Sequence, residues 1–433
     1  MFLAFSFLEN LLTFFYLLSL PLTDLKPETH KMDLFLDYTD KQTTNTSVKI
    51  SGSKSESNRL LILQQFYKNL TLENVSDSDD SVHLIHALTS NKKTVDIGHA
   101  GTAMRFLTAY FAVKEGRETL LTGSERMQNR PIKILVDALR MLGATIEYID
   151  KEGYPPLLIK GKKITKNKVA INGNVSSQYI SALVLIAPSL ENGLEIELLE
   201  EITSRPYLEM TLDLLRQIGI STSWKKNTIV ISPQSSISDK TITVESDWSS
   251  ASYFYSLVAL SNVNTALVLS SYHAKSLQGD NCLAEIYQNF GVKTTFTTNS
   301  ITLTKTDKKP ELKTLNLINA PDIAQTIVVT CFGLGIACDL TGLHTLKIKE
   351  TDRLVALQNE LQKFGAQIEI TNNSLHLKPS SILHKNCTVK TYNDHRMAMA
   401  FAPLALKTPL TIEDADVVTK SYVNFWQDLE KCF

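Results

Sequence analysis

The stretch LVDALRMLGATIEYI, residues 135–149, joins a helix-like segment to a strand-like one and recurs along the chain. Its copies read TLDLLRQIGISTSW (211–224), CLAEIYQNFGVKTTF (282–296) and ALQNELQKFGAQIEI (356–370). In each, apolar residues at helical spacing precede a glycine, and an extended segment follows it. The glycines, each suited to the left-handed backbone after a helix end, are Gly143, Gly219, Gly291 and Gly365, separated by 76, 72 and 74 residues. One structural unit therefore repeats.

A second element recurs in phase with the first. A small polar or charged cluster opens a helix-length apolar run at Gly101, Ser176, Ser249, Pro321 and Asn393, with spacings of 75, 73, 72 and 72 residues. A sixth run, SKSESNRLLILQQF, begins at Ser53, only 48 residues before Gly101, so the first unit lacks about a hairpin of chain. We interpret each unit as a buried helix, a strand pair, an amphipathic helix and a second strand pair.

The repeat predicts the domain organisation. At 433 residues the chain exceeds one ordinary core, so we expect two α/β domains of three units each, with helices inside and sheets outside. One domain spans 53–245, and the other combines 33–52 with 246–433. The strand-like SVKISG (47–52) is expected to complete the truncated last unit, which brings both chain ends into one domain.

Composition excludes several classes of protein. A net charge of −1 with scattered lysines argues against nucleic-acid binding. Five cysteines without a CxxC pair predict a reducing, cytoplasmic location and no disulfide framework or zinc site. His83 and His86 form a close pair, but no cysteine or carboxylate stands at ligand spacing, so we expect no metal.

Residues 1–32 form an apolar leader that we expect to lie outside the fold. Glu9 is the one charge in Met1–Leu20, and the segment lacks the Lys or Arg that begins a secretory signal. The leader is either a membrane anchor or translated upstream sequence before a true start at Met32, and we favour the second. No membrane association is expected for residues 33–433.

The polar clusters at the starts of the buried helices are candidate anion sites. A helix N-terminus offers free N–H groups and partial positive charge. Isolated clusters such as SSQ are better explained as N-caps, and a charge run such as KETDR is usually a solvated helix face. Arg105, Arg353 and Arg396, however, adjoin apolar stretches where an unpaired cation is costly. These arginines at element starts therefore indicate clamps for carboxylates and phosphates.

Eight motifs carry a specific resemblance. In order they are GSKSESNR, GTAMR, RMQNRPI, SSQYISAL, SRPYLEMTL, PDIAQT, KETDRL and NDHRMAMAF. Their order and spacing resemble those of the EPSP synthases (3-phosphoshikimate 1-carboxyvinyltransferases) over nearly the whole chain from Met32. The resemblance implies a two-domain inside-out α/β barrel of six βαβαββ-type units, with the active site in the interdomain cleft. It also implies transfer of the enolpyruvyl group of phosphoenolpyruvate to the 5-hydroxyl of shikimate 3-phosphate, a step of aromatic amino-acid biosynthesis.

The resemblance further implies roles for individual residues. Lys54, Asp322 and Glu350 are the expected catalytic residues, with Asp322 as the base on the hydroxyl and Glu350 as a proton donor. Lys54 and Lys349 stabilise developing charge. The residues expected to bind the substrates are Lys54, Ser55, Arg59, Gly101, Thr102, Arg126, Ser176, Ser177, Gln178, Ser204, Tyr207, Asp322, Lys349, Arg353, Arg396 and Lys420. No metal or organic cofactor is expected, and the enzyme is expected to be a monomer.

Two alternatives stay open. UDP-N-acetylglucosamine enolpyruvyl transferases share the fold and reaction type, but they usually carry a catalytic cysteine where this chain reads SERMQNRP (124–131). A binding protein that lost catalysis would lack Lys54, Asp322, Glu350 or Arg396, and all four are present. The chain departs from the usual family pattern at His99, Phe106 and Thr345.

Overall fold

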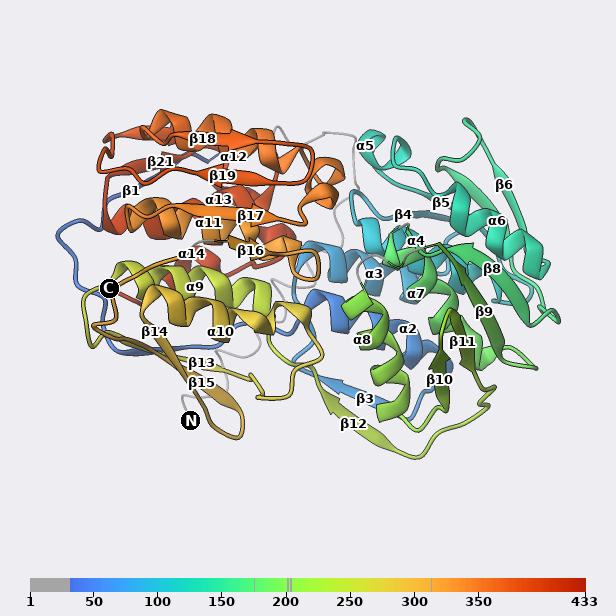
Figure 1. Cartoon of the computed structure of the whole chain (residues 1–433). Helices are drawn as coiled ribbons and strands as arrows, with labels where there is room; N and C mark the ends of the chain where they lie inside the picture. Colours follow the sequence, from blue (N-terminus) through green and yellow to red (C-terminus); the bar gives the residue numbers. More distant parts are fainter. Residues whose placement is uncertain (1–31, 175, 201, 203–204, 313) are drawn as a thin grey trace, which may run out of the picture. The chain divides into compact units, whose positions relative to one another are not determined.

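The computed structural model describes residues 32–433 apart from 175, 201, 203–204 and 313 (Figure 1). The chain divides into Met1–Met32 and Asp33–Phe433, and the second unit is the one described below. The predicted leader, except Met32, lies outside the described residues. In the described ranges no helix combines the length and apolar character needed to cross a bilayer.

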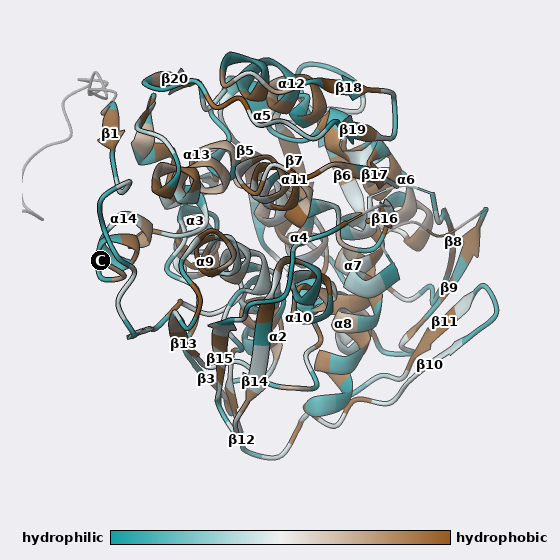
Figure 2. Ribbon diagram, turned by 60° about the vertical axis from the view of Figure 1, so that its left-hand side comes forward, coloured by the Kyte–Doolittle hydropathy of each residue, from teal (hydrophilic) through white to brown (hydrophobic). Residues whose placement is uncertain are grey.

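The apolar runs form buried helices, each starting at or near its predicted polar cluster. Tertiary packing buries these helices because they are apolar nearly all round, and every residue of Trp248–Leu260 is buried. In Figure 2 the ribbons of inner helices such as α9 and α11 include many hydrophobic (brown) residues. They are α2 (Lys54–Phe66), α4 (Gly101–Ala112), α7 (Ser177–Ile186), α9 (Trp248–Leu260), α11 (Ala324–Gly333) and α13 (His395–Phe401).

Outer helices follow the predicted amphipathic segments. They are α6 (Lys133–Leu142), α8 (Arg205–Gln217), α10 (Leu283–Ile286) and α12 (Arg353–Lys363), with α3 (Asp79–Thr89), α5 (Glu125–Gln128) and α14 (Phe425–Glu430) elsewhere. The segment after Cys282 is less regular than predicted, because α10 has four residues and continues as a 3₁₀ turn, Tyr287–Phe290. Gly143, Gly219, Gly291 and Gly365 have φ of 111°, 90°, 75° and 96°, which confirms their left-handed conformation.

Four sheets in the described residues share one topology. In each, the first two strands are parallel, and the last two return as an antiparallel hairpin whose final strand pairs with the second. Two sheets have the orders β4 (Thr94–Asp96), β5 (Glu118–Thr122), β7 (Leu157–Lys160), β6 (Thr145–Tyr148), and β8 (Lys168–Asn172), β9 (Leu194–Leu199), β11 (Thr228–Ile231), β10 (Thr222–Lys225). The others have the orders β2 (Thr46–Val48), β13 (Ala266–Ser270), β15 (Ser300–Lys305), β14 (Val292–Phe296), and β16 (Thr314–Asn316), β17 (Cys338–Thr341), β19 (Leu375–Leu377), β18 (Ile368–Ile370).

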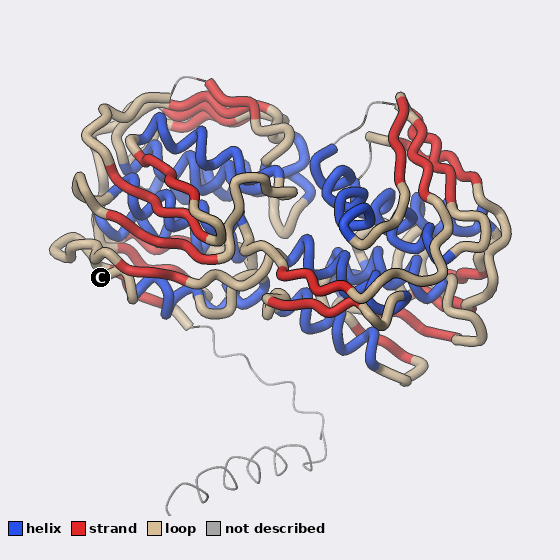
Figure 3. The backbone as a smooth tube through the Cα atoms, turned by 90° about the horizontal axis from the view of Figure 1, so that it is seen from below, coloured by secondary structure: helices blue, strands red, loops and turns tan. Residues whose placement is uncertain are grey.

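Two smaller sheets complete the α/β structure. One is a parallel pair, β12 (Lys240–Thr243) with β3 (Leu70–Glu73), and the described chain runs from β3 through α3 to β4 with no hairpin between them. The other has the order β1 (Leu34–Leu36), β21 (Leu410–Ile412), β20 (Cys387–Val389). Figure 3 shows the strands outside the inner helices.

Buried apolar side chains form two separate cores. One core contains residues from Leu36–Ile50 and Trp248–Cys432, and we call this part the terminal lobe. The other contains residues between Leu60 and Val244, and we call it the central lobe. In Figure 1 the terminal lobe carries the dark blue and yellow-to-red segments, and the central lobe the light blue and green ones.

The chain crosses between the lobes at two adjacent segments. Gly52 and Ser246 form a β-bridge, and the Ser53 N–H donates to the Glu245 carbonyl at 2.7 Å. The prediction that residues 47–52 complete the last sheet is wrong, since β2 pairs with β13 and β1 pairs with β21. The physical reason is that β2 runs directly into the crossover, which places it beside β13 and leaves the earlier strand for β21.

Gly52 should be sensitive to any side chain. A Cβ there would lie 1.8 Å from the Asn74 backbone oxygen, whereas a Cβ at Gly219 would have no atom within 4 Å and only its φ of +90° would be strained. We expect Gly52→Ala to reduce the free energy of unfolding by about 2 kcal/mol or more, and Gly219→Ala by about 1 kcal/mol. Urea denaturation measures both, and equal losses would contradict the steric argument.

Candidate active site

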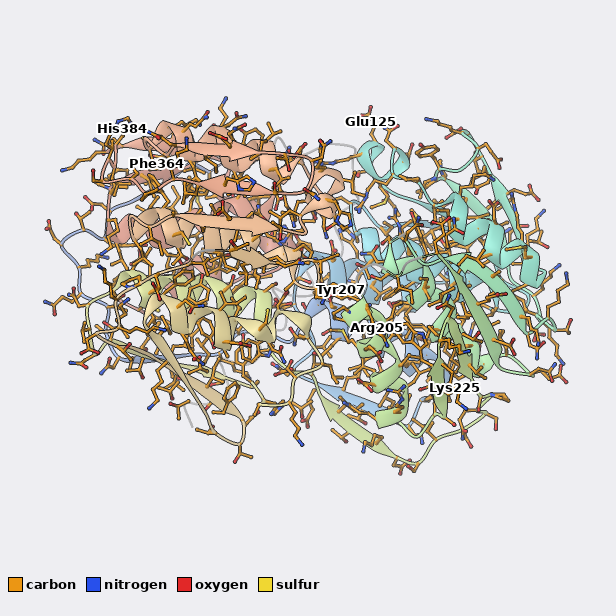
Figure 4. All side chains as sticks on the ribbon, viewed as in Figure 1. Glu125, Arg205, Tyr207, Lys225, Phe364 and His384 are labelled. Atoms are coloured by element: carbon orange, nitrogen blue, oxygen red, sulfur yellow. The ribbon has the colours of Figure 1, made fainter. Side chains whose placement is uncertain are left out.

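A cavity of about 620 Å³ lies where residues of both lobes meet. The predicted site residues that the structure describes all line it, and they are Lys54, Ser55, Arg59, Gly101, Thr102, Arg126, Ser176, Ser177, Gln178, Tyr207, Asp322, Lys349, Glu350, Arg353, Arg396 and Lys420. Ser204 lies outside the described residues. The N-terminal part of α8, which carries Tyr207, lies toward the terminal lobe in Figure 4.

Helix starts from both lobes contribute to the cavity wall. Ser53 caps α2 and Ser176 caps α7, where their hydroxyls accept from the Glu56 and Gln178 amides. Both serines line the cavity, as do Gly101 at the start of α4 and Asp322 just before α11. Capping and ligand approach are compatible, because a cap satisfies one N–H and leaves other backbone donors of the first turn available. The cavity is therefore suited to anionic ligands.

Arg353 organises the charged side of the terminal lobe. It is the first residue of α12 and only 1% exposed. Its Nε donates to Asp394 Oδ2 at 2.6 Å, Nη1 to Asp322 Oδ1 at 2.9 Å, and Nη2 to Glu350 Oε2 at 2.8 Å. One guanidinium thus holds three carboxylates from three segments, and its rigid planar set of donors fixes their directions.

The two predicted catalytic carboxyls are held ionised by neighbouring cations. Burial favours the neutral form of Asp322, but Lys349, Arg396 and Arg353 outweigh it and hold the pKa of this carboxyl well below its usual range. Burial of Glu350 is likewise outweighed, first by Arg353 and then by Lys420, so its pKa also lies well below the usual range. In this arrangement each can accept a proton, and Glu350 must take one up before it can donate one.

Two buried cations on the central-lobe side, Arg59 and Arg105, lack carboxylate partners among the described residues. Arg59 donates to Thr211 Oγ1 at 2.7 Å and to the Ser55 carbonyl at 2.7 Å. Arg105 donates to the carbonyls of Gly101 and Pro131. Burial lowers the pKa of each guanidinium to about 10, so both remain charged at neutral pH. This uncompensated positive charge is suited to a carboxylate or phosphate of a ligand.

Gly101 allows a close approach by another cation. A Cβ added there would lie 2.4 Å from Arg130 Nη1, so the small residue makes room for the guanidinium. Sequence reasoning noticed Arg130 in RMQNRPI but did not place it in the site, and the structure puts it in the cavity wall. The departure at Phe106 also has a structural role, because its ring lies 5.4 Å from the Arg59 guanidinium carbon.

Other cavity residues were missed by sequence reasoning. Asp80 lies 3.4 Å from Lys54, although the sequence shows it only as part of an acidic run, and Asp280 carried no signal. His395 is buried, neither ring nitrogen has a hydrogen-bond partner among the described residues, and Nδ1 lies 3.8 Å from Asp394 Oδ1. Burial, with the charge of Arg396, holds its pKa well below the usual range, so the ring is neutral.

Over the described residues, no group of three or more His, Cys, Asp or Glu side chains is arranged to hold a metal ion.

The fold and the site define a class of protein: an α/β enzyme with carboxylates and cations converging on a cavity for anionic substrates. The model of the EPSP synthase (3-phosphoshikimate 1-carboxyvinyltransferase) family matches residues 65–429. The 3-phosphoshikimate 1-carboxyvinyltransferase of Bacteroides fragilis strain YCH46 is 47% identical over 390 residues, covering 89% of this chain and 94% of that protein. The enzyme of the same name from Haemophilus influenzae strain PittEE is 37% identical over 418 residues, covering 89% and 96%.

Solved structures agree on the fold. An EPSP synthase structure from Acinetobacter baumannii matches with a TM-score of 0.76 and 19% identity, covering 92% of this chain and 98% of that one. The chain belongs to the EPSP synthase family, and it is a transferase of that family.

Breaking the Arg353 network should destabilise the protein. Asp394 is fully buried and accepts from the Arg353 side chain and from the Arg396 N–H at 2.9 Å. We expect Asp394→Ala to reduce the free energy of unfolding by about 3–5 kcal/mol, because it leaves a buried cation short of a partner. The matched control is Glu369→Ala, which removes an exposed ion pair with Lys378 and should leave the urea midpoint unchanged. Equal behaviour of the two variants would contradict this account.

Proposed function

We propose that the cavity binds phosphoenolpyruvate and shikimate 3-phosphate and transfers the enolpyruvyl group to the 5-hydroxyl of shikimate 3-phosphate. The products are 5-enolpyruvylshikimate 3-phosphate and phosphate, and the reaction belongs to the shikimate pathway. The observation that carries this conclusion is the position of two ionised carboxylates beside several cations in one cavity, in a chain of this family.

The charges suggest where each substrate binds. Arg353, Arg396 and Lys420 converge near Asp322 and Glu350, and with Arg126 they would surround phosphoenolpyruvate. Lys349 lies 3.3 Å from Asp322 and would add to that charge. Gly101 and Thr102 begin α4 and would give the phosphate access to the backbone.

Shikimate 3-phosphate would occupy the central-lobe side. Ser176, Ser177 and Ser204 would hold its phosphate, with Gln178 and Tyr207 nearby. Gln178 already lies against Thr102, since its Nε2 donates to Thr102 Oγ1 at 3.3 Å. Ser55 and the unpaired Arg59 would hold its carboxylate and hydroxyl side, because Arg59 has no anion of its own among the described residues.

The chemistry would proceed by addition and elimination. Asp322 would remove the hydroxyl proton as the oxygen attacks the phosphate-bearing carbon, and Glu350 would exchange a proton with the methylene group. Lys54 and Lys349 would stabilise charge as it develops. Loss of phosphate from the tetrahedral intermediate then restores the double bond. These steps use groups of the protein and the substrates alone.

We also propose that the two lobes are two domains, 33–52 with 246–433 and 53–245, built from six βαβαββ-type units as an inside-out barrel. The two separate cores and the repeated sheet topology support this division. Two multiply anionic substrates bind poorly in an open, solvated cleft, so the domains would close around them and exclude water. A cytoplasmic monomer that binds no nucleic acid remains our prediction.

Phosphate release from phosphoenolpyruvate tests the activity. We expect purified residues 32–433 to release phosphate with shikimate 3-phosphate as acceptor and not with UDP-N-acetylglucosamine. Asp322→Ala should lower kcat at least about 100-fold, because it removes the proposed base. Release with the nucleotide sugar alone would overturn the choice of acceptor, and no release with either from folded protein would favour a binding protein.

Small-angle scattering tests closure and oligomeric state together. The radius of gyration of the Asp322→Ala variant, in which turnover is blocked, should fall when both substrates are added. The forward scattering should give the mass of one chain, 48.4 kDa for the full sequence less residues 1–31. An unchanged radius at saturating ligand would rule out closure, and a doubled mass would rule out a monomer.

A further inference from the structure

Asp280 is a carboxyl group of the cavity to which the proposed mechanism gives no role. It follows Gly279 in a short 3₁₀ turn, Gly279–Cys282, lines the cavity and is 8% exposed. Among the described residues, its side chain has no hydrogen-bond or ion-pair partner. The other carboxylates of the cavity wall differ, because each accepts from a cation or from a capping N–H and hydroxyl: they are Asp80, Asp247, Asp322 and Glu350.

The backbone around Asp280 is held between the two lobes. Gln278 donates through Nε2 to Glu56 Oε1 at 2.8 Å, and its Oε1 accepts from the Trp248 N–H at 2.8 Å. A Cβ on Gly279 would lie 3.0 Å from the Asn319 carbonyl and 3.1 Å from Pro206 Cβ. Asn319 shortly precedes Asp322, and Pro206 precedes Tyr207, so Asp280 lies where the proposed acceptor site and the proposed base meet.

The charges facing Asp280 come from several elements. Burial, reinforced by the Asp322 and Asp247 carboxylates, raises the pKa of Asp280 to about 7, although Arg396 and Lys349 oppose the shift. Burial raises the pKa of the Tyr207 hydroxyl and of the Cys282 thiol, and the charge of Asp280 adds to both shifts. The facing groups are therefore Tyr207 of α8, Asp247 before α9, Asp322 before α11, Lys349 before α12, Arg396 of α13 and Cys282 of the same turn.

This environment differs from that of Asp322. Three cations within 3.3 Å stabilise the ionised form of Asp322, which makes it a poor place for a proton to stay. Asp280 has no such cation, so a proton is more stable on Asp280 than on Asp322. Carboxyl pairs whose environments separate them in this way commonly divide the work of accepting and holding a proton.

We propose that Asp280 is a second carboxylate on the acceptor side of the site, which takes over from Asp322 the proton that the acceptor's hydroxyl group releases. This inference rests on the proposed function. In the addition step the O–H bond breaks and its proton passes to Asp322 and then to Asp280, while the oxygen bonds to the phosphate-bearing carbon. The double-bond electrons take a proton at the methylene from Glu350, which has first taken one up. In elimination the methyl group returns a proton to Glu350, the bond between the carbon and the phosphate oxygen breaks, and the proton on Asp280 leaves with the phosphate.

The pH dependence of kcat in Asp280→Asn tests the proposal, because asparagine keeps the shape and cannot take up the proton. In the wild type kcat should rise with pH through about 7, since Asp280 must be ionised to accept a proton. Asp280→Asn should lower kcat about 100-fold or more and leave KM for shikimate 3-phosphate within about threefold. In this variant kcat should no longer rise with pH through about 7. Asp280→Glu should restore a rise of kcat with pH and part of the rate.

Asp307→Asn is the matched control. It makes the same substitution at an exposed residue outside the cavity wall, so this variant should keep the wild-type rate and the rise of kcat with pH. A wild-type rate in Asp280→Asn, a rise of kcat through pH 7 that persists in it, or loss of that rise in Asp307→Asn would each overturn the proposal. If circular dichroism shows that Asp280→Asn does not fold, the rise of kcat with pH in Asp280→Glu decides. A rise at the same pH as in the wild type would overturn the proposal. No phosphate release from the wild type would instead refute the proposed function.

Discussion

The hydrogen bonds from Arg353 to three carboxylates are the interaction on which the charged side of the cavity depends. A buried guanidinium is costly unless its donors are satisfied, and here Asp394, Asp322 and Glu350 satisfy them. Because these carboxylates come from separate segments, one side chain fixes the start of α12 relative to those of α11 and α13. The same guanidinium contributes to the low pKa of both carboxyls, after Lys349 and Arg396 at Asp322 and ahead of Lys420 at Glu350.

The repeated topology explains why so many functional groups meet in one place. In each repeat a polar cluster precedes a buried helix, and the packing of these helices in two cores brings starts from both lobes to the cavity. The crossover at Gly52 and Ser246 joins the lobes by backbone contact close to Ser53 and Asp247, which cap two of these helices. The crossover and the site are therefore neighbours.

The two sides of the cavity are electrostatically different. On the terminal-lobe side, carboxylates and cations neutralise one another around Arg353. On the central-lobe side, Arg59 and Arg105 contact carbonyls and hydroxyls, and their positive charge is left for a ligand. The two sides therefore differ in the charge that the described residues leave uncompensated. Asp280 lines the cavity without a cation partner among the described residues, and burial raises its pKa to about 7.

The sequence by itself determined the repeat, the helix-ending glycines and the motif residues, because hydrophobic periodicity and glycine conformation are local properties. It also singled out residues that line the cavity, since resemblance to a family preserves motif positions. Only the tertiary structure decided which short strand pairs with β21, because β1 and β2 are both three-residue segments and the nearby crossover selects their partners. It alone revealed Asp80, Asp280 and Arg130 in the site and the ionised state of Glu350. Those properties depend on burial and on charges distant in sequence, which no local pattern records.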